Sequence, residues 1–206
     1  MSTPTSSETQ SVPTPRTMPE FCEIAELGDE AKGLLDPGHT PREFMNVLVD
    51  GEHFPDAIRF LAHALPRREG IWWAWVCARG AAGNDPSSEV KGALDAVERW
   101  VTQPTDANRR ASFAAAEAAT LSTPAGCAAL AVFFSGGSMG PADTPPVPPG
   151  EFMTAKAITG AVMAAAVCSE PERAPDKYRA YISHGLEVVK RLDLWGATGG
   201  GDGSHG

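Results

Sequence analysis

The sequence contains no apolar run of the roughly 20 residues that a transmembrane helix requires. The longest candidate spans residues 157–168, lies between Lys156 and Glu170, and is short enough for a buried core helix. The N-terminus shows neither the basic segment nor the apolar stretch of a secretory signal peptide. We therefore expect a protein without a membrane anchor and without a membrane partner.

Cysteines are few and widely spaced, at Cys22, Cys77, Cys127 and Cys168. No C-x-x-C motif and no cysteine–histidine pair has the spacing of metal ligands. Three of the four lie in apolar helical stretches, where a reduced cysteine packs as a small hydrophobic residue. Two disulfides in a secreted protein are the alternative, which the N-terminus disfavours. Free thiols and a cytoplasmic location are the better interpretation.

Long basic clusters are also missing. The chain has 17 Lys and Arg residues against 26 Asp and Glu residues, which gives a net charge of −9. Its two arginine pairs, Arg67-Arg68 and Arg109-Arg110, are too short for a basic stripe, and we interpret them as solvated residues at helix ends. Because an acidic surface repels phosphate backbones, we expect no nucleic-acid partner.

Alternating polar and apolar residues, the pattern of a β-strand, are scarce. The one strand-like segment, residues 130–134, follows an alanine-rich stretch that favours helix. Elsewhere apolar residues recur with the helical period, as at Val90, Leu94, Val97 and Val101. The sequence predicts an all-α fold of about nine helices, near residues 20–35, 41–50, 54–64, 67–82, 87–102, 106–121, 124–134, 153–169 and 175–195. Their short links predict antiparallel neighbours in a bundle or in stacked helical hairpins.

Several helix starts are marked by a capping residue followed by proline. Thr40 and Glu43 have the spacing of a capping box, in which each side chain accepts a backbone N–H of the other residue. Asp85 and Thr123 are likewise each followed by a proline. We expect helices to begin at these three places.

Composition divides the chain into three parts. Residues 1–19 are almost entirely Ser, Thr, Pro, Glu and Gln and are predicted to be disordered. Residues 20–195 form one helical domain, and the glycine-rich residues 196–206 form a flexible tail. Within the domain, the glycine- and proline-rich segment 135–150 is an unusually long loop, and loops of that length are usually functional or disordered.

One motif in this loop suggests catalysis. Residues 136–140 match the G-x-S-x-G pattern of a hydrolase nucleophile elbow, with Ser138 as the nucleophile. That elbow needs a strand before the serine and a helix after it, whereas here a helical segment precedes it and Pro141 opens a proline-rich loop. We therefore favour a glycine-rich helix end and keep Ser138 as a weak nucleophile candidate.

Metal ligands are also hard to assemble from the histidines. His53 lies among Asp50, Glu52 and Asp56, but a hard cation would need more oxygen ligands, and zinc would need further His or Cys. We interpret this segment as a solvated turn and predict no metal and no cofactor. His63 is interpreted as a partly buried helix residue with one satisfied ring nitrogen.

Three of the five tryptophans follow Arg67 and Arg68 within a few positions. On a helix Trp72 and Trp75 share one face and Trp73 points away from it. Burying all three is difficult, because each indole N–H needs a partner, and Trp and Arg are the residues enriched in binding hot spots. A bulky packing centre is the simpler interpretation. The alternative is a docking patch that includes an exposed tryptophan, Trp73 above all.

A second docking candidate is the segment Pro-Pro-Val-Pro-Pro at residues 145–149. Pro145 and Pro148 meet the P-x-x-P pattern that proline-binding grooves recognise. Prolines also stiffen loops without binding anything, so the segment alone does not decide between recognition and rigidity.

Several segments have a distinctive order and spacing. They are LPRREGIWW at 65–73, WVTQPT at 100–105 with NRR at 108–110, TPAG at 123–126, FSGGS at 134–138 and TAKA at 154–157. Together they resemble a bacterial family classed only as a domain of unknown function, over roughly residues 40–190. The resemblance implies a bacterial source and one helical domain. By analogy with relatives near secretion-associated gene clusters, it implies an accessory role, but no activity or catalytic residue.

Three functions remain open. The leading hypothesis is a non-enzymatic helical interaction protein, that is, an adaptor, a chaperone or an accessory subunit. The second is a small-molecule-binding or hydrolytic protein that uses the glycine-rich loop. The third is an immunity-type protein whose acidic surface binds a basic toxin. The sequence leaves the oligomeric state open.

Overall fold

The computed structural model describes residues 17–141 and 143–196, which form ten α-helices, one 3-10 helix and no strand. The predicted all-α fold is confirmed. In chain order the helices are α1 (Met18–Ile24), α2 (Asp29–Gly33), α3 (Pro41–Asp50), α4 (Phe54–Ala64), α5 (Arg67–Ala82), α6 (Ser88–Thr102), α7 (Asp106–Ala118), α8 (Pro124–Phe133), α9 (Met153–Val167), η1 (Pro171–Arg173) and α10 (Ala174–Arg191).

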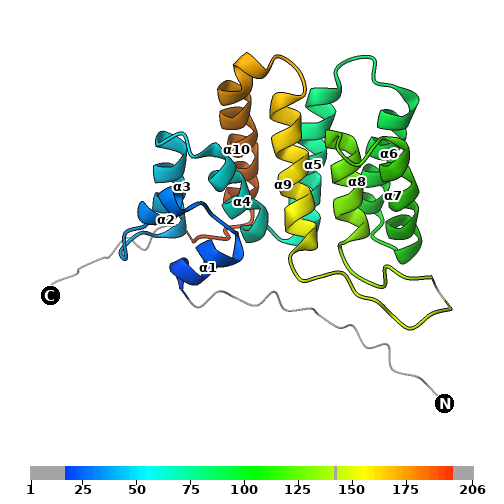
Figure 1. Cartoon of the computed structure of the whole chain (residues 1–206), viewed down its shortest axis with the longest axis horizontal. Coiled ribbons are helices and arrows are strands. Elements are labelled where there is room, and N and C mark those ends of the chain that lie inside the picture. Colours follow the sequence, from blue (N-terminus) through cyan, green and yellow to red (C-terminus); the bar gives the residue numbers. More distant parts are fainter. Residues whose placement is uncertain (1–16, 142, 197–206) are drawn as a thin grey trace, which may run out of the picture.

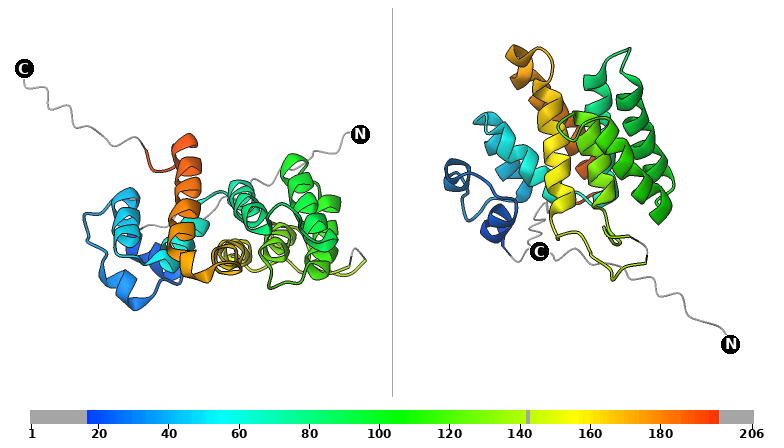
Figure 2. Two further views of the ribbon diagram at one scale, coloured as in Figure 1. Left: turned by 90° about the horizontal axis from the view of Figure 1, so that it is seen from above. Right: turned by 45° about the vertical axis from the view of Figure 1, so that its right-hand side comes forward.

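The helices α5 to α9 stand side by side as a bundle, running alternately up and down in Figure 1. Consecutive helices from α5 to α8 pack against each other, and α9 returns beside both α5 and α8. On the far side of α9, α10 packs against α4, α5 and α9, and α3 packs against α4. Figure 2 shows α1 to α4 gathered on the side of the molecule opposite α6 and α7.

Two of the three predicted caps are confirmed. At α3 the capping box is complete, because Glu43 N–H donates to Thr40 Oγ1 at 3.2 Å and Thr40 N–H donates to the Glu43 carboxylate at 2.8 Å. At α8, Thr123 Oγ1 accepts the Gly126 N–H at 3.0 Å. The predicted cap at Asp85 is wrong: α6 starts at Ser88, where the Ser87 hydroxyl accepts a backbone N–H and serves as the cap.

The predicted helix over residues 20–35 is also wrong, because it is broken into α1 and α2. Glu26 has a positive φ of 53°, which ends the helical path, and Gly28 is extended. The Gly28 N–H donates to the carboxylate of the buried Asp56 on α4 at 2.8 Å. A side chain 28 residues further on therefore holds the break in place.

The predictions for the chain ends fall mostly outside the described residues. Thr17 caps α1, so the helical part begins at Met18, inside the segment 1–19 predicted to be disordered. At the other end α10 stops at Arg191, before the predicted end at residue 195. Asp193, with a φ of 51°, redirects the chain there.

The core is built from buried apolar side chains of all ten α-helices, and Trp73 is the largest fully buried one. All four cysteines are free thiols: Cys22 and Cys77 are buried, Cys127 is half-buried and Cys168 is exposed. Across the described residues, every helix falls short of the length and apolarity that a membrane crossing needs.

Candidate functional site: an apolar groove at one end of the bundle

A groove of about 900 Å³ opens at the end of the bundle where α5 and α9 begin, the lower end in Figure 1. Its walls come from α1, the junction of α4 and α5, the loop before α9, the first turns of α9 and the residues after α10. We call this surface the apolar groove. Its apolar lining includes Met18, Phe21, Ile24, Phe152, Ile158, Leu194 and Trp195.

Aromatic rings form the floor of the apolar groove. Phe60 of α4 is buried, and its ring meets the ring of Phe21 edge-on, with centroids 4.8 Å apart, and the ring of Trp195, at 6.0 Å. Phe44 lies behind Phe60, with centroids 5.6 Å apart. Edge-to-face contacts of this kind are favourable, so one buried ring positions both α1 and the chain beyond α10.

Helix α1 supplies one wall because its apolar residues share a face. Met18, Phe21 and Ile24 follow each other at three-residue spacing, which places them on one side of a helix. All three side chains are half-buried, so each still exposes surface toward the groove.

His63, on the last turn of α4, is the most unusual polar residue in the groove lining. Its Nδ1 lies 2.8 Å from the carbonyl oxygen of Arg59 and, since a carbonyl can only accept, Nδ1 carries the proton. Nε2 is buried and has no hydrogen-bond partner among the described residues, and the ring of Phe152 lies against the imidazole at 5.8 Å. The interpretation of His63 as a partly buried residue with one satisfied nitrogen is confirmed.

This environment predicts a pH dependence of stability. Burial lowers the pKa of the His63 imidazole below its usual value, outweighing the hydrogen bond to Arg59, which raises it. The unfolded chain therefore binds a proton near pH 6.5 that the folded chain does not. We expect the free energy of unfolding to fall as the pH drops from 7 toward 5, by at most about 1.4 kcal/mol per pH unit.

Urea unfolding at a series of pH values, run beside the His63→Leu variant, checks this expectation. The variant loses the titrating group, so its stability should change less over the same pH range. Equal slopes for the two proteins would contradict the assignment to His63.

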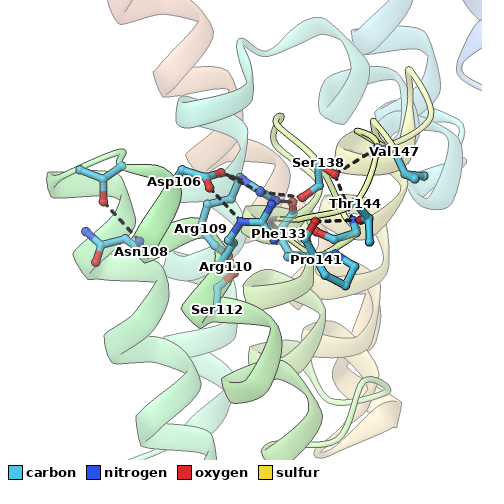
Figure 3. Close-up of polar contacts among 12 residues, drawn as sticks. Asp106, Asn108, Arg109, Arg110, Ser112, Phe133, Ser138, Pro141, Thr144 and Val147 are labelled. Atoms are coloured by element: carbon cyan, nitrogen blue, oxygen red, sulfur yellow. Dashed lines mark hydrogen bonds and ion pairs between the residues drawn. The ribbon is translucent and has the colours of Figure 1, made fainter.

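The loop between α8 and α9 forms part of the groove wall and is held by one buried arginine (Figure 3). Arg109 on α7 donates to the carbonyl oxygen of Phe133 at 2.8 Å, to that of Ser138 at 2.9 Å, and to the carboxylate of Asp106 at 2.8 Å. Its guanidinium also lies over the Phe133 ring, 5.3 Å from the centroid. Arg110 adds a bond to the Gly140 carbonyl at 2.9 Å.

Arg109 is only 3% exposed. The interpretation of Arg109-Arg110 as solvated residues at a helix end is therefore wrong for Arg109. Asp106 binds both arginines, and the hydrogen bond from Arg109 holds the pKa of its carboxyl below the usual value. Gly137 has a φ of 64°, and a Cβ there would lie 2.9 Å from Arg109 Nη2. Loop conformation and arginine position are thus coupled.

Ser138 does not have the surroundings of a nucleophile. Helix α8 precedes it, and the described residues between it and α9 form no helix or strand. Its hydroxyl oxygen accepts the backbone N–H groups of Gly140 at 3.1 Å and Val147 at 3.0 Å. The Ser138 side chain therefore joins two parts of its own loop by hydrogen bonds. This agrees with the interpretation of the segment as the start of a loop.

The tryptophan segment does not form one docking patch. Trp73 is fully buried, and its indole N–H donates to the Tyr181 carbonyl at 2.8 Å, so it packs in the core as the simpler interpretation expects and is not the exposed tryptophan of the alternative docking patch. Trp72 is half-buried against α10, where Arg191 lies over its ring, and Trp75 donates to the Leu94 carbonyl on α6. The three rings face different neighbours because positions 72, 73 and 75 point in different directions from a helix that packs against α6, α8, α9 and α10.

The remaining predicted docking residues lie apart from one another. Arg67 lines the apolar groove and donates to the Ser135 carbonyl at 3.3 Å, whereas Arg68 donates to the Val101 carbonyl at 2.8 Å. Pro145 is exposed outside the groove, and Pro148 belongs to the groove lining. Within the described residues no three His, Cys, Asp or Glu side chains come together as metal ligands.

Sequence reasoning missed the groove as a whole. Phe152 falls between the predicted loop 135–150 and the predicted helix 153–169, Trp195 is the last residue of a predicted helix, and most of α1 falls within the predicted helix 20–35. The apolar spacing of Met18, Phe21 and Ile24 was an available signal. Nothing local could show that the chain after α10 returns to α1.

The fold and this site define an all-helical bundle domain with an apolar groove at one end. The model of the Family of unknown function (DUF6931) matches residues 44–189, which is most of the chain. The protein therefore belongs to this family, and the expected membership of a family of unknown function is confirmed. Helices α1 and α2 lie before the matched range. No curated protein and no solved structure matches the chain.

Proposed function

We propose that this protein is a non-enzymatic interaction module that binds an apolar segment of a partner protein in the apolar groove. The groove itself carries the proposal, because an apolar concave surface of this size on a domain marks a binding site. Among the described lining residues, polar groups that could perform chemistry do not converge. Nε2 of His63 is covered, and the Thr154 hydroxyl already donates to the Phe134 carbonyl at 2.7 Å.

The shape of the binding partner follows from the secondary structure. The described residues contain no strand, so they offer no sheet edge to which an extended peptide could add. The groove instead runs between helices α1, α4 and α9, which suits an amphipathic helix that inserts its apolar face. An adaptor, chaperone or accessory subunit would use such a surface.

A pair of leucines provides the test. Leu194 lines the apolar groove and is 37% exposed, while Leu121 is 44% exposed and lies outside it. A neutral amphipathic helical peptide of about 15 residues, with leucine on one face and glutamine elsewhere, serves as the probe. We expect Leu194→Asp to weaken its binding at least about tenfold, since the aspartate must be desolvated against an apolar face.

Isothermal titration calorimetry measures the effect, with Leu121→Asp as the matched control that should bind like the unchanged chain. Equal loss in both variants would refute the proposal. So would the absence of binding to the unchanged protein by this peptide and by charged peptides with the same leucine face.

A small-molecule ligand is the second candidate, and the volume of the groove favours it, because pockets of about 300–1,000 Å³ are typical for such ligands. Native mass spectrometry of the purified protein distinguishes the two. A retained apolar molecule that the peptide displaces would support the small ligand.

The setting of the interaction is also part of the proposal. The four free thiols support a reducing compartment, the bacterial cytoplasm, as the place of action. An immunity-type role remains an alternative, favoured by the net charge of −9, and it would require a basic toxin as the partner.

A further inference from the structure

The negative charge of this protein is concentrated in one part of the chain. Residues 20–52 contain nine Asp and Glu against two Lys and Arg, a net charge of −7. Residues 53–196 contain fifteen acidic and fourteen basic side chains, a net charge of −1. Most of the net charge of −9 therefore belongs to the segment that contains α1, α2, α3 and the turn after α3.

All nine acidic residues of this segment are exposed. Four of them form ion pairs: Glu23 and Asp29 with Lys32, Glu26 with Lys156, and Glu52 with Arg179. The other five have no ion pair with any residue that the structure describes. They are Glu20, Glu30, Asp36, Glu43 and Asp50. We call the segment 20–52 the acidic layer.

The acidic layer and the apolar groove share a border. On helix α1, Phe21 and Ile24 line the groove. Each follows a glutamate directly in sequence, Glu20 before Phe21 and Glu23 before Ile24. On the opposite wall, the exposed Glu151 belongs to the groove lining next to Phe152. The cation of the lining, Arg67, donates to the Ser135 carbonyl of the loop. An occupant of the groove thus meets apolar contacts below and negative charge at its edges.

From this arrangement we infer that the partner segment is a basic amphipathic helix, with apolar residues toward the groove and Lys or Arg toward the acidic layer. This inference rests on the proposed function and names the chemical class of its partner. Opposite charge at the rim of an interface accelerates association and rejects partners of the same sign. An acidic or neutral helix of equal apolarity gains no such attraction.

Three helical peptides of about 15 residues with the same leucine face test the inference, carrying lysine, glutamine or glutamate at the other positions. At an ionic strength of about 0.02 M the lysine peptide should bind at least about tenfold more tightly than the glutamate peptide. At about 0.5 M this difference should shrink severalfold, because the Debye length falls below the spacing of the charges.

Two matched double variants locate the charge effect. Glu20→Gln with Glu151→Gln removes two exposed carboxylates at the groove border, while Glu98→Gln with Glu117→Gln removes two exposed carboxylates on α6 and α7. We expect the first double variant to bind the lysine peptide about two- to fivefold more weakly and to bind the glutamine peptide with unchanged affinity. The second should affect neither peptide.

The outcomes separate this inference from the proposed function. Equal affinities for all three peptides, or equal effects of the two double variants, would overturn the basic partner and leave the groove as the binding site. If none of the peptides binds, both proposals fail. If the protein self-associates and the Leu194→Asp substitution abolishes this self-association, the groove binds a second copy of this chain. That result would also overturn the inference.

Discussion

Replacing Arg109 with alanine is expected to lower the free energy of unfolding by about 2–4 kcal/mol. The side chain is buried, and its loss leaves the carbonyl oxygens of Phe133 and Ser138 without the donors that they have in the folded protein. Asp106 suffers less, because its carboxylate is 60% exposed and can be hydrated. Urea denaturation followed by circular dichroism gives the difference.

Arg110→Ala is the matched control for this prediction. Arg110 binds the same carboxylate and the Gly140 carbonyl, but its side chain is 33% exposed, so water replaces its contacts more easily. We expect a loss below about 1 kcal/mol. Equal losses of unfolding free energy in the two variants would show that the burial of Arg109 adds nothing to its contribution to stability. Since the loop forms a wall of the apolar groove, Arg109→Ala should also weaken peptide binding.

Trp73→Ala is expected to cost about 3–5 kcal/mol, the largest effect of any substitution proposed for the core. The indole is fully buried between α5 and α10, and Gly185 of α10 approaches it so closely that a Cβ there would lie 3.0 Å from the ring. Alanine leaves a cavity that these packed helices cannot close. Thermal and urea unfolding measure the loss.

The neighbouring Trp72 offers the comparison. It is half-buried, with the Arg191 guanidinium over its ring, so Trp72→Ala should cost only about 1–2 kcal/mol. If Trp72→Ala proved the more damaging change, the burial assigned to the two rings would be wrong. A Trp73→Ala protein of unchanged stability would revive the docking role that the sequence suggested for Trp73.

The helices were predictable because their signals are local. Apolar spacing and caps such as Thr40 with Glu43 involve residues within one or two turns, and most predicted ranges agree with the structure within a few residues. The family membership was predictable for a similar reason, since short segments retain their order along the chain.

The failures share a physical cause, which is contact between residues far apart in sequence. Asp56 holds the break between α1 and α2 by accepting the Gly28 N–H, and Arg109 is buried by a loop that begins 26 residues later. In both cases an acidic or basic side chain forms hydrogen bonds with backbone groups that lie more than 20 residues away in the sequence. Because Asp and Arg residues are usually exposed in folded proteins, a prediction from the sequence alone places such residues on the surface.

The apolar groove shows the same limit at the level of a site. Phe21, Phe152 and Trp195 come from three distant segments and line the same groove, where the rings of Phe21 and Trp195 lie against Phe60. Each is an ordinary apolar residue in its own segment. The packing of α10 against α4, α5 and α9 brings the chain that carries Trp195 back to the groove that α1 also lines.

The most direct test of the central claim maps bound peptide onto the structure. Amide chemical shifts of the labelled protein are recorded by NMR while the lysine peptide is added. The claim predicts the largest changes at the groove, at Phe21, Ile24, Phe152 and Leu194 and in the Trp195 indole, with little change on α6 and α7. Shifts centred on α6 and α7, or no shifts at saturating peptide, would contradict it.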